Sequence, residues 1–191
     1  NIADICPVGA LTLKRFRFQA RVWNLRKTPS TCAECSRGCA ISVEVLRRKE
    51  VVRFRPRYDA EVNQWWMCDT GRFAFEPVRR SARLGPASVR GYSALEPTTV
   101  AAALETAADM LRTHAQPVFV ASPFMTQEEA GAALALARAL GSKALFVSPA
   151  PNGLEDDLLH TGDPCPNRRG LSELGFEALD AAALLAQLAQ A

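Results

Sequence analysis

The spacing of apolar residues changes near the middle of the chain. In the first half, apolar and polar residues alternate in two runs, Ile41–Val45 and Val51–Phe54, which are separated by a short charged stretch. Alternation with a period of two predicts β-strands, and two such runs joined by a polar turn predict a β-hairpin. Beyond Pro97, Val100 and Leu104 begin a helical spacing that continues through Ala108 and Leu111.

The second half predicts alternating strands and helices. Pro117–Ala121 and Lys143–Val147 are short apolar runs, typical of buried strands. Between them, Thr126 and Glu129 predict a capping box for a helix that ends near Gly141. Strand, helix and strand in this order imply a right-handed βαβ unit with a parallel sheet. A last helix is predicted over Phe176–Gln190.

Two other segments have weaker patterns. Residues 1–30 contain basic and apolar residues in alternation at Arg15–Phe18, which predicts an extended connecting arm. The stretch between Gly71 and Pro97 is rich in Pro and Arg, and we interpret it as a connector.

Composition favours a folded chain with an uneven distribution of charge. The 191 residues are 48% hydrophobic, which is enough for a core, and they contain no run of the ~20 apolar residues that a membrane-spanning helix needs. No secretory leader is recognisable, so we expect a soluble chain in a reducing compartment, without a direct membrane span. Residues 1–90 carry a net charge of +10 (18 Lys and Arg, 8 Asp and Glu), whereas residues 91–191 carry −7 (5 and 12). A basic half can face nucleic acid, an anionic membrane or an acidic partner subunit.

Four cysteines form the most specific motif. Cys32, Cys35 and Cys39 are spaced x2 and x3, and Cys68 follows after 28 residues. Three cysteines on one loop and a distant fourth can supply the four thiolates of a [4Fe-4S] cluster, and Gly38 allows the backbone to approach closely. A structural zinc site would usually have two CxxC pairs, so the spacing favours a cluster while zinc stays open.

Three longer motifs resemble a known family. They are Asp4–Leu11 (DICPVGAL), Arg26–Cys32 (RKTPSTC) and Val62–Phe73 (VNQWWMCDTGRF). Over residues 1 to about 76, the chain resembles the G subunit of NADH-quinone oxidoreductase (respiratory complex I), the large iron-sulfur subunit, which is related to the molybdopterin oxidoreductase family.

The resemblance implies two cluster sites. The four cysteines would hold an additional [4Fe-4S] cluster that lies off the main electron path, which makes the cluster the preferred alternative over zinc. Cys6 would be the final ligand of a second [4Fe-4S] cluster, whose other ligands lie upstream of these residues in the family. The chain would therefore contain one complete and one partial site.

The residue at position 70 differs from the one that is typical of the related molybdenum enzymes. Those enzymes typically have a Lys two residues after the last cysteine, between the cluster and the pterin, whereas this chain has Thr70. Threonine cannot supply that positive charge, so we do not expect molybdopterin.

The resulting prediction is an α+β iron-sulfur domain with a β-hairpin, followed by a small α/β domain. Residues 1–30 would be the connecting arm, 31–96 the Mo/W-oxidoreductase-like [4Fe-4S] domain, and 97–191 a shortened α/β molybdopterin-oxidoreductase-like domain. Because that last domain is several times longer in the family, we expect a natural short form or a piece of a longer protein.

The predicted function is electron transfer from NADH toward quinone, as a subunit of the oxidoreductase and without catalysis by this chain alone. The partners would be other subunits of a respiratory complex, peripheral on the cytoplasmic side of the bacterial inner membrane. We interpret Trp23, Trp65 and Trp66 as packing around the cluster rather than base stacking, so no nucleic-acid partner is expected. The alternatives are a fragment of a molybdopterin-dependent oxidoreductase of the formate dehydrogenase type, a hydrogenase-associated iron-sulfur subunit, and a zinc module.

Overall fold

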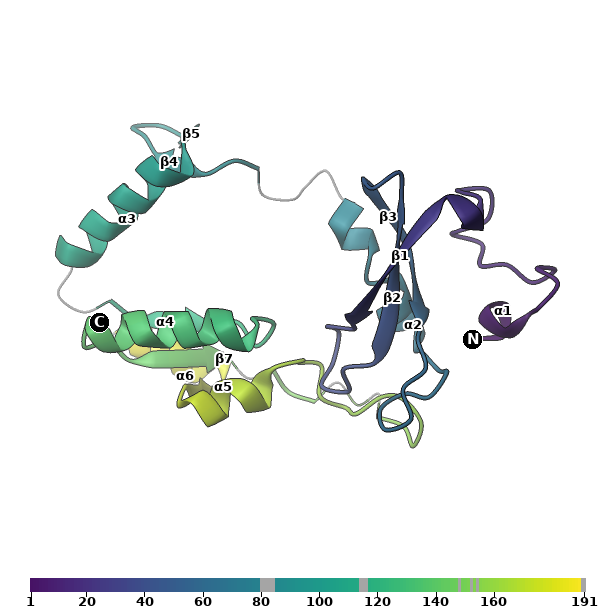
Figure 1. The fold of residues 1–191 in the computed structure, drawn as a ribbon. Coiled ribbons are helices and arrows are strands. Elements are labelled where there is room, and N and C mark those ends of the chain that lie inside the picture. The colour runs from purple at the N-terminus through teal and green to yellow at the C-terminus, as the bar shows by residue number, and fades with distance from the viewer. Residues whose placement is uncertain (80–84, 114–116, 148, 152, 154, 190–191) are drawn as a thin grey trace. The chain divides into compact units, whose positions relative to one another are not determined.

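The chain divides into two compact units. A computed structural model describes residues 1–79, 85–113, 117–147, 149–151, 153 and 155–189 (Figure 1). Unit 1 comprises Asn1–Ser81 and Ser148–Gly170, and unit 2 comprises Ala82–Val147 and Leu171–Ala191. The boundaries of the arm and of the two domains that the sequence suggests stay predictions.

Unit 1 contains a three-stranded antiparallel sheet in the order β1-β2-β3. The strands are β1 (Leu25–Thr31), β2 (Ala40–Leu46) and β3 (Glu50–Pro56). The predicted hairpin is therefore confirmed as β2 and β3. Most of strand β1 lies in the segment interpreted as an extended arm, but its place in the sheet was not predicted. It is an edge strand whose residues after Leu25 are all exposed, and an unburied strand has no apolar alternation to reveal it.

The core of unit 1 includes two of the four motif cysteines. Its buried members are Cys32, Cys39, Ile41 and Met67, with Val43 and Phe54 packed against them. The sheet thus buries one side of the segment that carries the cysteines.

Short helices complete the part of unit 1 that precedes Ala82. They are α1 (Ile2–Ile5), the 3-10 turn η1 (Val22–Asn24), α2 (Asp69–Phe73) and the 3-10 turn η2 (Glu76–Arg79).

The part of the arm before Val22 differs from the extended structure that was predicted. Residues Arg15–Phe18 form turns rather than a strand. Phe16 is buried, with the Arg53 guanidinium 3.9 Å from its ring centroid, whereas Phe18 is 91% exposed and has a φ of +64°. The side chain of Phe16 alone is buried in this segment. The alternation of basic and apolar residues at Arg15–Phe18 therefore does not come from a strand with one buried face.

Unit 2 contains a parallel sheet in the order β6-β7-β8. The predicted βαβ elements are present as β6 (Phe119–Ala121), α4 (Gln127–Ala139) and β7 (Ala144–Val147). The capping box is confirmed, since the Thr126 side chain accepts from the Glu129 backbone N–H and the Glu129 side chain accepts from the Thr126 backbone N–H. Its core consists of Ala121, Ala130, Leu134, Phe146, Leu171 and Phe176.

The last predicted helix was wrong in its first part. The third strand β8 (Glu177–Leu179) precedes a shorter helix, α6 (Ala181–Leu188), and the predicted end at Gln190 lies outside the described residues. Residues Glu177–Leu179 pair with β7 instead of forming a helix, and the Asp180 side chain caps α6 by accepting from the Ala183 N–H.

The stretch interpreted as a connector also contains a hairpin. Its strands are β4 (Ser88–Arg90) and β5 (Leu95–Pro97), which pair antiparallel. Helix α3 (Val100–Thr113) has the predicted position but buries none of its residues, and α5 (Arg168–Leu174) completes the elements. Among the described residues, no helix is long and apolar enough to cross a membrane.

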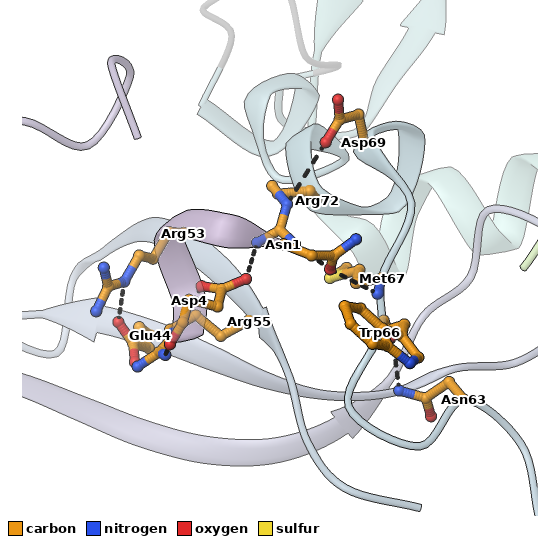
Figure 2. Close-up of polar contacts among 10 residues, drawn as sticks. All are labelled: Asn1, Asp4, Glu44, Arg53, Arg55, Asn63, Trp66, Met67, Asp69 and Arg72. Atoms are coloured by element: carbon orange, nitrogen blue, oxygen red, sulfur yellow. Dashed lines mark hydrogen bonds and ion pairs between the residues drawn. The ribbon is translucent and has the colours of Figure 1, made fainter. Parts of the chain in front are cut away.

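Asn63 joins the hairpin to the loop before Cys68. This side chain is 2% exposed, and its Oδ1 accepts from the Ala40 backbone N–H at 2.8 Å. Its Nδ2 donates to the Trp66 carbonyl at 3.0 Å, a contact drawn in Figure 2. The Asn63 side-chain amide therefore forms hydrogen bonds with the backbone of β2, 23 residues earlier in the chain, and with that of the loop three residues later.

We expect Asn63→Ala to lower the unfolding free energy of unit 1 by about 2 kcal/mol, because buried backbone groups lose their partners. Tryptophan fluorescence during urea unfolding reports on unit 1, since all three tryptophans lie in it. The exposed Asn24→Ala is the control and should change stability by less than about 0.5 kcal/mol. Equal stabilities for the two variants would contradict this role of Asn63.

Candidate metal centre

The sheet places three of the motif cysteines on one loop. Cys32 directly follows β1 and Cys39 directly precedes β2, so both lie at the same end of the paired strands. The Cys32 backbone N–H donates to the Cys39 carbonyl at 2.8 Å, which closes the loop that carries Cys35. Cys68 comes from a different segment, where it is the N-cap of α2.

The buried thiols are held in their neutral form. Cys32 and Cys39 are buried, whereas Cys35 and Cys68 are half-buried, and all four are free cysteines. Burial raises the pKa of Cys32 to about 11, and the neighbouring thiols of Cys39, Cys68 and Cys35 add to the rise. Burial also raises the pKa of Cys39. Thiolates at these positions need a compensating positive charge, which a metal centre supplies.

Gly71 leaves room for the sulfur atom of Cys32. A Cβ built at this position would lie 2.8 Å from Cys32 Sγ, so a side chain at residue 71 would displace that sulfur, and 3.7 Å from Cys68 Sγ, which is an ordinary contact distance. The Gly71 backbone N–H also points at Cys68 Sγ, at 3.4 Å. The first turn of α2 thus provides both space and a hydrogen-bond donor for the cysteine sulfurs.

The types of residue at the cysteine loop suit an iron-sulfur cluster, although their side chains are not gathered into a closed ligand set in this structure. Four cysteine thiols are a soft donor set, suited to iron-sulfur clusters and to zinc, and the Gly71 position is kept open beside them. In the described part of the chain, no three His, Cys, Asp or Glu side chains are grouped closely enough to hold a metal ion.

A distant segment of unit 1 contacts the cysteine loop. The Ser36 N–H donates to the Asp163 carbonyl at 3.2 Å, and the Ser36 and Thr161 hydroxyl oxygens lie 2.6 Å apart. On the other side, Arg37 Nε donates to the Val62 carbonyl at 2.9 Å. The loop between Cys35 and Cys39 is therefore held from both sides, and no sequence pattern indicated these contacts.

Cys6 lies outside this set, at the C-terminal end of α1. Its side chain is half-buried, and the backbone N–H groups of the following turn, that of Leu11 first, lower the pKa of its thiol. Ala10, Val8 and Gly9 contribute in the same direction. Amides directed at a sulfur stabilise a thiolate and are typical of iron-sulfur ligands.

A buried ion network ties the Cys6 segment to the rest of unit 1 (Figure 2). Asp4 forms ion pairs with the buried Arg72 and with Arg55, whose Nε lies 3.1 Å from Asp4 Oδ1. Sequence reasoning missed this network. Asp4 and Arg72 both belong to motifs quoted above, but a motif does not show which of its residues pair with one another.

The tryptophans do not all pack as interpreted from the sequence. Trp23 is 79% exposed and Trp65 is 61% exposed, while Trp66 is half-buried. Trp65 stacks against Tyr58 with ring centroids 4.7 Å apart, so its contact is with another surface ring. The interpretation as shielding of the cysteine site is therefore wrong for Trp23 and Trp65.

Thr70 and Cys165 also have defined positions. Thr70 is exposed on α2. Cys165 is fully buried, and its backbone N–H donates to Asp163 Oδ1 at 3.0 Å. Arg168 forms an ion pair with the same Asp163 at 3.0 Å. Cys165 is therefore a packed residue of the segment around Asp163, which contacts the cysteine loop through Ser36.

Comparison with protein families identifies the segment around the cysteines. Residues 25–80 match the molybdopterin oxidoreductase Fe4S4 domain. The match begins with β1 and includes Cys32, Cys35, Cys39 and Cys68.

Curated relatives extend this similarity. The chain is 51% identical over 76 residues to NADH-quinone oxidoreductase subunit 3 of Thermus thermophilus, which covers 40% of this chain and 10% of the relative. It is 42% identical over 112 residues to the NADH-quinone oxidoreductase G subunit of Streptomyces coelicolor (58% and 13%) and 36% identical over 112 residues to that of Rickettsia conorii (59% and 16%). The resemblance to this large iron-sulfur subunit is thus confirmed, and the matched stretch spans 10–16% of the length of these relatives.

We expect Gly71→Ala to reduce the iron bound per chain at least about tenfold, because the new Cβ displaces Cys32 Sγ from its place. Gly131→Ala is the matched control, since Gly131 is also helical but has nothing within 4 Å of its Cβ position. The control should keep its iron and gain up to about 1 kcal/mol of stability. Iron determination after anaerobic reconstitution measures the difference, and full loading of Gly71→Ala would refute the crowding argument.

Proposed function

We propose that this chain is part of the iron-sulfur electron-transfer subunit of an NADH-quinone oxidoreductase, and that it helps relay electrons from NADH toward quinone. The observation that carries this proposal is the Fe4S4 domain match over residues 25–80, which encloses all four motif cysteines. Relatives named as NADH-quinone oxidoreductase subunits share the same region.

In this proposal, Cys32, Cys35, Cys39 and Cys68 bind one [4Fe-4S] cluster. The cluster, when bound, supplies reversible one-electron transfer. The chain binds it through thiolates, and the buried Ile41 and Met67 beside Cys32 and Cys39 exclude water from that side. Solvent exclusion and hydrogen bonds to sulfur set the reduction potential, so the apolar core and the Gly71 amide would tune it.

Cys6 would be one ligand of a second [4Fe-4S] cluster. Its support is the turn of backbone N–H groups over residues 8–11, which lowers the pKa of the thiol. The remaining ligands of that cluster would come from residues other than those of this sequence. The chain would then bind one redox centre and supply one ligand to another, without performing hydride transfer itself.

The proposed partners are other subunits of a respiratory complex. The net charge of +10 over residues 1–90 (18 Lys and Arg, 8 Asp and Glu) favours acidic partner surfaces. We propose a peripheral position within a membrane complex, on the cytoplasmic side of the bacterial inner membrane, with no nucleic acid bound.

A molybdopterin-dependent oxidoreductase is the second candidate function, because the domain family that matches residues 25–80 takes its name from the molybdopterin oxidoreductases. Against it, the position two residues after Cys68 is Thr70, which carries no charge to bridge cluster and pterin. Pterin released on denaturing the purified protein would favour this candidate over the first.

The test is metal analysis combined with anaerobic EPR of the reduced protein. We expect four irons and four sulfides per chain and a signal from a reduced [4Fe-4S] cluster. Zinc at one per chain without an iron signal would refute the cluster and identify a zinc module instead.

Cys35→Ser should abolish most of the bound iron and lower the stability of the loaded protein by several kcal/mol, because ligation contributes folding free energy. Cys165→Ala is the control, since Cys165 is a buried cysteine outside the proposed ligand set, and it should retain its iron. If Cys35→Ser keeps both its iron and its melting temperature, the ligand assignment is wrong.

A further inference from the structure

Arg72 is the largest fully buried side chain in the described part of the chain, with an exposed fraction of 1%. Its guanidinium forms an ion pair with the Asp4 carboxylate and donates to Asn1 Oδ1 at 2.9 Å. Its Nε lies 3.6 Å from Asp69 Oδ1. Asp4 is shared with Arg55, which also donates to the Asp4 carbonyl at 3.0 Å. Buried charge is thus matched by carboxylates and an amide.

The network joins two segments that carry cysteines of the proposed clusters. Asp4 lies two residues before Cys6, and Arg72 lies four residues after Cys68. Asn1 Oδ1 also accepts from the Met67 backbone N–H at 3.0 Å, next to Cys68. Figure 2 shows Asn1 and Asp4 beside Arg72.

Apolar packing does not hold the Cys6 segment. Helix α1 buries none of its residues, and Ile2 and Ile5 are 69% and 63% exposed. The polar contacts of Asn1 and Asp4 are therefore the specific attachment of this helix to the Cys68 segment. An ion pair with additional hydrogen bonds has defined geometry, so it can fix a position as well as stabilise it.

We propose that the Asp4–Arg72 ion pair, together with Asn1, is a positioning bridge that fixes Cys6 relative to the cluster held by Cys68. The bridge rests on the proposed function, because it concerns the separation of two iron-sulfur centres. Because the bridge joins the two segments directly, it would hold the ligands of the two centres at a fixed separation. Asp4 and Arg72 would then act through the cysteine segments, without touching a cluster.

The test measures the distance from Cys6 to the cluster in the full chain. With the cluster loaded, Cys6 and Cys165 are the cysteines outside the four-ligand set, and Cys6 is half-buried whereas Cys165 is fully buried, so a nitroxide label should attach at Cys6. The reduced cluster enhances the relaxation of the nitroxide, and EPR gives the distance and its spread. We expect a single narrow distribution for the unsubstituted chain.

Asp4→Asn should broaden this distribution and shift it to longer distances, and Asn1→Ala should broaden it less. Glu44→Gln is the matched control, because Glu44 is a buried carboxylate that likewise forms an ion pair with an arginine, Arg53, but lies within the sheet. That variant should keep the narrow distribution. If Asp4→Asn fails to fold, Asn1→Ala, which leaves no buried charge unpaired, decides the question.

Hydrogen exchange supplies a measurement that does not need the cluster. The Met67 amide should exchange about tenfold faster in Asn1→Ala, because a lost hydrogen bond of about 1.4 kcal/mol corresponds to that factor. It should exchange at the original rate in Glu44→Gln. An unchanged distance distribution in folded Asp4→Asn, or equal broadening in Glu44→Gln, would overturn the bridge. An unsubstituted chain that binds no iron would instead overturn the proposed function, while the exchange result would still test the bridge.

Discussion

A guanidinium removed from water must be paired, and the arrangement of unit 1 follows from the pairing of Arg72. This side chain is 1% exposed and extends from α2, the helix capped by Cys68. Leaving such a charge without a partner costs several kcal/mol, so folding must bring an anion to it. The anion is Asp4, from the segment that ends in Cys6. One electrostatic requirement therefore brings two cysteine-bearing segments together.

The cysteines themselves are part of the apolar packing. Cys32 and Cys39 belong to the same buried cluster as Ile41 and Met67. Because these thiols are buried and close to one another, burial raises the pKa of Cys32 to about 11, and a metal centre would replace that unfavourable state with ligand bonds. Metal binding and folding should consequently be coupled in unit 1, whereas unit 2 has a separate core around Phe146 and Leu171.

The family match lies entirely within the first of the two units. The Fe4S4 domain match ends at residue 80, near the boundary of the two units at Ser81. The similarity to the Streptomyces coelicolor relative covers 112 residues, 58% of the chain. The electron-transfer proposal therefore depends on unit 1, and the parallel sheet of unit 2 adds a fold without adding a ligand to the proposed site.

Features that depend on neighbours in the chain could be predicted from the residues alone: the hairpin, the Thr126 capping box, the β6–α4–β7 unit and the cysteine spacing. These follow from local periods and short motifs. The edge strand β1, the strand β8 and the pairing of Asp4 with Arg72 became visible in the folded chain. Edge strands and buried ion pairs acquire their stability from distant partners, so they have no local pattern. The sequence thus indicated four cysteines with the spacing of metal ligands, whereas tertiary contacts set how the segments around them are held.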